Sequence, residues 1–111
     1  MDIVVTIPKN EFKNVQKEEI WAKKQNRSAI CFWKIRHEAK KLKPGDRIYF
    51  IEKGMITSYN IFLSYDKDCI CEVTGRKWLG LNLIMDTPSI VLKKPVPMKG
   101  FQGFRYIERI E

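Results

Sequence analysis

Short apolar runs separated by turn-forming residues recur along the whole chain. Most of these runs are rich in β-branched or aromatic residues, and Gly, Pro, Asn or Asp bounds several of them, which is typical of strands. Little helix is expected: a short surface helix within residues 9–24 and one helical turn at 36–43. The strand candidates are residues 3–7, 28–35, 47–51, 55–63, 69–73, 78–85, 89–92 and 103–107.

Two of these runs are apolar almost without interruption. Ile3–Ile7 is expected to be a buried first strand, and Arg47–Ile51 a central one, because a strand covered on both faces loses the alternation of polar and apolar residues. Lys43-Pro44-Gly45-Asp46 is expected to be a turn before the central strand, and Glu52-Lys53-Gly54 a tight hairpin after it. The pattern predicts a mainly-β, α+β fold: a compact barrel of about six or seven strands with one or two short helices.

Length and composition predict a single domain, residues 1–111. The chain has 111 residues and no internal repeat, low-complexity tract or linker. No apolar run approaches the roughly 18 residues that a membrane span requires, so no membrane partner is expected. Three cysteines, Cys31, Cys69 and Cys71, lack the spacing of a zinc site. They are interpreted as free thiols in a reducing compartment, which favours a cytoplasmic location and no metal.

The charge distribution gives the first indication of a partner. The formal net charge is +8, and residues 1–53 hold 13 basic and 7 acidic side chains. A basic surface of this kind attracts polyanions, of which nucleic acid is the commonest.

Motifs for catalysis are missing from the sequence. The only histidine is His37, and there is no glycine-rich phosphate loop, nucleophile elbow or zinc-binding HExxH. No cofactor is therefore expected. A binding protein is favoured over an enzyme, because general acid–base catalysis needs positioned groups with tuned pKa values.

Aromatic and basic residues are interleaved in three segments, 33–36, 75–78 and 98–106. Aromatic rings stack on bases, and lysine and arginine neutralise phosphates. Glycine beside Arg76 and Lys99 permits close approach of a ligand to the backbone. Trp21 and Trp78 lie in polar or turn contexts and are expected to wall a pocket. The predicted nucleic-acid-binding residues are Trp21, Lys34, Arg36, Arg76, Trp78, Lys99, Gln102 and Arg105.

The order of several motifs resembles the PUA-like superfamily, in particular its EVE and ASCH branches. Ile20-Trp21-Ala22 is similar to the hydrophobic-Trp-small motif of EVE domains. Leu42-Lys43-Pro44-Gly45-Asp46-Arg47-Ile48-Tyr49-Phe50 resembles the lysine–glycine–aspartate segment that precedes a strand in both branches, and Gly103–Ile107 resembles the closing strand. The resemblance covers nearly the whole chain.

This resemblance implies a small pseudo-barrel whose cleft binds RNA, or a flipped or modified base in DNA, with Trp21 in the pocket wall. Two alternatives stay open at this point. One is an ASCH-type hydrolase acting on RNA or a modified nucleoside, for which Lys34, Tyr49 and Glu72 are the nearest candidates. The other is a small protein-interaction regulator.

Overall fold

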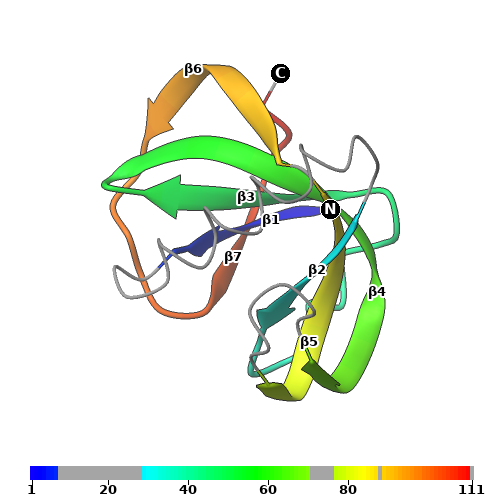
Figure 1. Ribbon diagram of the computed structural model, residues 1–111. Coiled ribbons are helices and arrows are strands. Elements are labelled where there is room, and N and C mark those ends of the chain that lie inside the picture. Colours follow the sequence, from blue (N-terminus) through cyan, green and yellow to red (C-terminus); the bar gives the residue numbers. More distant parts are fainter. Residues whose placement is uncertain (8–28, 71–76, 88, 111) are drawn as a thin grey trace.

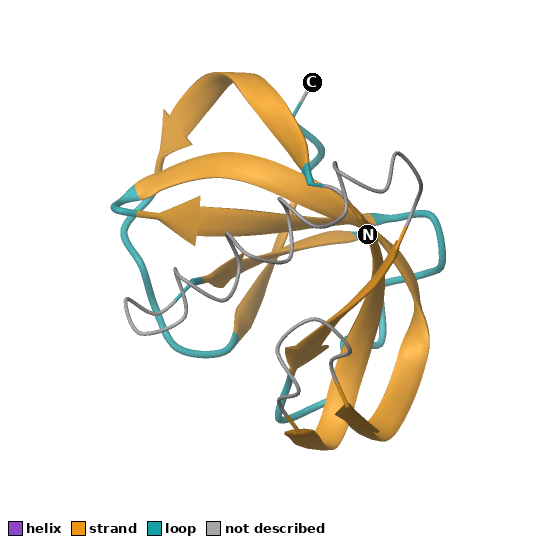
Figure 2. Ribbon diagram, in the orientation of Figure 1, coloured by secondary structure: helices purple, strands orange, loops and turns teal. Residues whose placement is uncertain are grey.

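The fold is mainly β, as predicted. A computed structural model describes residues 1–7, 29–70, 77–87 and 89–110, and these residues contain strands and no helix (Figures 1 and 2). Within these ranges, accordingly, no helix is long and apolar enough to cross a membrane. The strands are β1 (Asp2–Thr6), β2 (Ala29–Lys34), β3 (Arg47–Glu52), β4 (Met55–Ile70), β5 (Lys77–Thr87), β6 (Ile90–Pro97) and β7 (Phe104–Ile107).

One long strand, β4, connects the two halves of the sheet. The strand order is β2-β5-β4-β3-β1-β7, with β6 also paired to β4. The first part of β4 pairs with β3 and the second part with β5, and Figure 1 shows β4 bending between them. Register shifts at Phe62/Ser64 and Lys67/Cys69 accompany this bend, since bulges kink a strand and increase its twist.

The predicted barrel is not closed by hydrogen bonds between the described strands. β2 pairs with β5 and β7 pairs with β1, so β2 and β7 are the two ends of the pairing order. Bending of β4 curves the sheet without bringing these two end strands into register with each other.

The neighbouring strands β1 and β3 are buried on both faces. β1 and β3 are parallel, with Ile3 opposite Ile48 and Val5 opposite Phe50, whereas the other pairs are antiparallel. Residues 3, 5, 48 and 50 belong to the first core, together with Phe62 and Leu83. Residues 4, 49 and 51 point the other way, into a second core with Ile56 and Leu92. This double coverage explains the continuous apolar runs of both strands.

The hairpin between β3 and β4 was predicted correctly. Lys53 and Gly54 both have positive φ, 52° and 77°, as the central residues of a type I′ turn require.

The expected helical turn at residues 36–43 is instead a hydrogen-bonded turn. The Leu42 N–H donates to the Ala39 carbonyl at 2.9 Å, and the hydroxyl of Tyr65 bonds both backbone groups of Ala39. Because the Tyr65 side chain takes the hydrogen bonds of the Ala39 backbone and Pro44 follows soon after, a regular helix does not form here. The other predicted helix, within residues 9–24, falls in the segment 8–28, outside the described residues.

Two strands extend beyond their predicted ends. The strand predicted over residues 55–63 was expected to end before a solvated turn at Asp66-Lys67-Asp68, but β4 continues through these residues to Ile70. Pro95 and Pro97 were expected to break the chain, but they lie within β6, which pairs with β4 only near its two ends. Pro95 is tolerated because residues 92–95 lie between the paired positions and need no ladder hydrogen bond. Pro97 pairs with Met55 but is the last residue of β6, which pairs only with β4 among the described strands.

Candidate functional site

A basic turn, residues 36–43, lies between β2 and β3. Its exposed residues carry four positive charges, with Glu38 as the one acidic residue of the turn. Ala39 and Leu42 are buried in the first core and hold the turn against the sheet. The turn therefore presents its charge to solvent on an anchored backbone. The four cations are Arg36, Lys40, Lys41 and Lys43.

Two tyrosines from distant strands hold this turn. The Tyr65 hydroxyl accepts the Ala39 N–H at 2.8 Å and donates to the Ala39 carbonyl at 3.2 Å. Burial raises the pKa of Tyr65, which outweighs the lowering effect of the Ala39 hydrogen bond, so this hydroxyl keeps its proton. The Tyr106 hydroxyl accepts the Lys41 N–H at 3.2 Å, and the Lys41 ammonium lies 5.6 Å from the Tyr106 ring centre. The basic turn is thus attached to both β4 and β7.

A second basic region, which we call the acid-free segment, spans residues 87–107. It contains four basic residues and no acidic one, between Asp86 and Glu108. Its basic side chains are exposed, whereas Met98 and Phe101 pack against the second core. The four cations are Lys93, Lys94, Lys99 and Arg105.

The loop before β7 is closely packed against the end of β1. The Phe101 N–H donates to Thr6 Oγ1 at 3.0 Å. A Cβ atom at Gly100 would lie 2.9 Å from Thr6 Cγ2, so Thr6 occupies the space that the missing side chain leaves. Arg105 places its guanidinium carbon 4.3 Å from the Phe101 ring centre. This contact joins the loop to β7.

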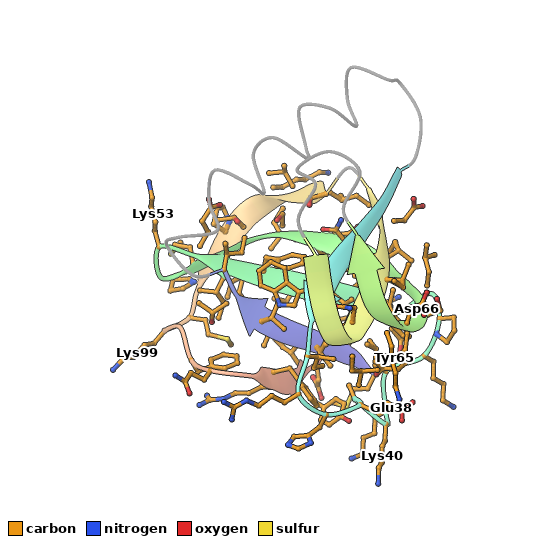
Figure 3. The ribbon with its side chains drawn as sticks, turned by 60° about the horizontal axis from the view of Figure 1, so that its bottom comes forward. Glu38, Lys40, Lys53, Tyr65, Asp66 and Lys99 are labelled. Atoms are coloured by element: carbon orange, nitrogen blue, oxygen red, sulfur yellow. The ribbon has the colours of Figure 1, made fainter. Side chains whose placement is uncertain are left out.

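The two basic regions meet at β7. Arg105 and Tyr106 are neighbours in this strand and point to opposite faces, and Tyr106 contacts the basic turn through Lys41. In Figure 3, Lys99 and Lys40 both point away from the protein, one from each basic region. The arrangement places eight exposed cations in two regions joined at a terminal strand of the sheet.

The structure groups only part of the predicted site. Lys99, Gln102 and Arg105 lie together around the loop before β7, and all three are exposed. Arg36 lies on the basic turn and is also exposed. Backbone positions alone are described for Lys34, the last residue of β2, and Trp78, in β5. Trp21 and Arg76 lie outside the described residues.

Two residues of the acid-free segment were not predicted as site residues. Lys93 and Lys94 lie in β6, beyond the predicted end of that strand at Leu92. The signal that identifies them is the run of 21 residues without a carboxylate, from Thr87 to Ile107.

The structure describes the surroundings of two further residues from the sequence analysis, Trp33 and Tyr49. Trp33 is half-buried and packs edge-on against Phe50, with ring centres 5.2 Å apart. Tyr49 is fully buried, and its hydroxyl accepts the Ile110 N–H at 2.9 Å and donates to the Ile110 carbonyl at 3.0 Å. It also accepts a hydrogen bond from Arg47. Tyr49 thus holds the end of the chain against β3. Glu72 lies outside the described residues.

An ionic cluster connects the start of β1 to the turn before β3. Arg109 donates to both carboxylate oxygens of Asp2 at 3.1 Å, and Asp2 accepts the Arg47 N–H at 2.8 Å. Asp46 accepts hydrogen bonds from the Met1 ammonium and the Lys43 N–H. Burial by itself would raise the pKa of Asp46, but these hydrogen bonds and the nearby positive charges outweigh it and lower the pKa.

Stability should fall in acid through Asp46. Its pKa is lower in the folded protein than in the unfolded chain, so its contribution is complete above about pH 4 and disappears as the pH falls through the folded value. We expect Asp46→Asn to lower the free energy of unfolding by about 1 kcal/mol at pH 7. Urea unfolding between pH 7 and pH 3 should show the variant and the unsubstituted protein converging. A difference that stays constant to pH 3 would contradict the prediction.

Comparisons with known proteins give no relative: no family model, curated protein or solved structure matches the chain. No group of metal-ligating side chains is present among the described residues.

Proposed function

We propose that the protein is a nucleic-acid-binding module of the PUA-like type, which binds RNA, or a flipped or modified base in DNA. The observation that carries the proposal is the joining of the basic turn to the acid-free segment at β7. Together these two regions hold eight exposed cations and one acidic residue, Glu38. Phosphate groups are the ligands that such a surface attracts, and they provide most of the sequence-independent affinity.

The anchoring of both regions supports binding to an extended polyanion. The basic turn is held by Tyr65 and Tyr106, and the loop before β7 by Thr6. Cations on an anchored backbone lose less conformational entropy when they bind than cations on a mobile tail. In the finer form of the proposal, Trp21 and Trp78 wall a base pocket. Its rim consists of Arg76, Lys99, Gln102 and Arg105.

The environment of Tyr49 favours a binding module over the hydrolase alternative. A catalytic tyrosine has to reach the substrate, but this side chain is fully buried and its hydroxyl is engaged with Ile110 and Arg47. The exposed cations of the two basic regions need no such access, because they already face solvent.

The test is titration of a fluorescent single-stranded RNA with the protein and with two double variants. Lys40→Glu/Lys99→Glu removes one cation from each basic region. We expect its affinity to fall about 25-fold at 0.1 M salt, because each lost contact with a single strand accounts for a factor of about five. Its salt dependence should also be shallower by about 1.4 in log–log slope.

The matched control is Lys53→Glu/Lys67→Glu, which changes the net charge equally at exposed positions outside both regions. Lys53 lies in the β3–β4 hairpin and points away from the protein in Figure 3. We expect this variant to retain most of the affinity. Equal losses in the two variants would show that net charge alone drives binding, and the absence of binding by the unsubstituted protein would reject the proposal.

A further inference from the structure

Two arginines of the described chain lie over aromatic rings, and they differ in what else they contact. The guanidinium carbon of Arg47 lies 4.2 Å from the centre of the Tyr59 ring. Arg47 also donates hydrogen bonds to the Tyr49 hydroxyl and the Ile110 carbonyl, so its guanidinium is engaged within the protein. Arg105 lies 4.3 Å from the centre of Phe101 and is exposed. No carboxylate in the described part of the chain forms an ion pair with it.

The Phe101 ring under Arg105 is held in place by the second core and by Thr6. Phe101 is half-buried against the second core, and its N–H donates to Thr6 Oγ1. Gly100 is pressed against the same threonine, and Gly103 uses a positive φ of 79° to turn the chain into β7. The guanidinium therefore rests on an immobilised ring and not on a flexible loop.

A planar cation supported in this way offers a flat surface for a ligand that is itself planar. Phe101 occupies one side of the guanidinium, and the exposure of Arg105 leaves surface for a second planar group. Unpaired nucleobases stack on arginine planes as well as on aromatic rings, and a neighbouring phosphate is attracted by the same charge. In a duplex the faces of paired bases are covered by their neighbours, so the ligand has to present an unpaired base, as a single strand does along its whole length.

We infer that the Arg105–Phe101 pair is a stacking platform for an unpaired base of single-stranded nucleic acid. The inference rests on the proposed function and narrows it to a class of ligand and a contact. Lys99 and Gln102 lie on the same loop and are exposed, so they flank the platform with a charge and an amide. The cations of the basic turn contact the phosphates of the same strand beyond β7.

The experiment separates stacking from charge by a conservative substitution. Arg105→Lys keeps the positive charge and removes the plane. We expect it to weaken binding of a single-stranded RNA by about 5- to 150-fold, the range found for loss of one stacked base, and to leave the salt dependence unchanged. A strand of the same length with abasic sites has the same charge but nothing to stack, and we expect it to bind the unsubstituted protein and Arg105→Lys alike.

The matched control is Arg109→Lys, the same substitution at an arginine that pairs with Asp2 and lies outside both basic regions. Its affinity for the RNA should match that of the unsubstituted protein. If the unsubstituted protein binds RNA but Arg105→Lys binds it equally well, or if the abasic strand binds as tightly as the RNA, the platform is rejected and the proposed function stands. If the unsubstituted protein binds neither strand, the proposed function fails, and the platform with it.

Discussion

Phe62→Ala should be among the most destabilising single substitutions in this protein. Phe62 is 2% exposed, lies in the first core and packs edge-on against Tyr65 at 5.0 Å. Removing a buried phenyl ring loses its transfer free energy and leaves a cavity, which together cost about 3–5 kcal/mol. A domain of this size has a total stability of about 5–15 kcal/mol, so the loss is a large fraction of it. Urea unfolding followed by tryptophan fluorescence measures the change.

The adjacent residue in β4 provides the control. Leu63 is 38% exposed and points away from the core, so Leu63→Ala should cost less than about 1 kcal/mol. The backbone of Phe62 forms two hydrogen bonds with the turn before β3. Its N–H donates to the Asp46 carbonyl, and its carbonyl accepts the Gly45 N–H. These bonds survive the substitution, so the loss reports on side-chain burial. Similar costs at residues 62 and 63 would show that this face of β4 is not the core.

The sequence predicted the centre of the fold well, because burial leaves a direct pattern there. The apolar runs at residues 3–7 and 47–51 have no polar alternation, and both became strands covered by a core on each face. The hydrophobic pattern does not indicate which strand each of them pairs with. That β1 pairs with β3, and in parallel, depends on contacts between segments 45 residues apart, for example Ile3 with Ile48.

The errors arise where tertiary contacts override local signals. Pro95 reads as a strand breaker, but in an incompletely paired strand its missing N–H costs nothing. Charged residues 66–68 are typical of a turn, but pairing with β5 continues β4 through them. Residues 36–43 read as a helical turn, but the Tyr65 hydroxyl takes both backbone groups of Ala39. A single sequence does not reveal which distant side chain reaches a backbone group.

In the candidate site, too, local sequence signals indicate some features and tertiary contacts determine the others. Lys99, Gln102 and Arg105 lie around one loop because they are neighbours in the chain, so the sequence alone is enough to group them. The connection of this group to the basic turn depends on Tyr106 and Lys41, which are 65 residues apart, and no local pattern indicates it. Tyr49 is the reverse case. Its residue type suggested chemistry, and only its burial against Ile110 shows a structural role.

Binding of single-stranded RNA should weaken steeply with salt. If about five of the eight exposed cations in the two basic regions contact phosphates, the log–log slope is about −3.5, because each contact with a single strand contributes about −0.7. Raising the salt from about 50 to 200 mM then weakens binding by about 100-fold. Fluorescence anisotropy at four or five salt concentrations measures the slope. Thermal unfolding at each concentration verifies that the protein remains folded.

The slope of affinity against salt concentration distinguishes phosphate contacts from base stacking in the two basic regions. Displacement of counterions scales with the number of phosphates neutralised, whereas stacking of a base on Arg105 is almost independent of salt. Affinity that persists with a slope near zero would therefore exclude the basic turn from the interface and leave at most the loop before β7. A slope steeper than about −5.6 would need more cations than these two regions contain. Basic residues elsewhere in the chain would then have to contact the strand as well.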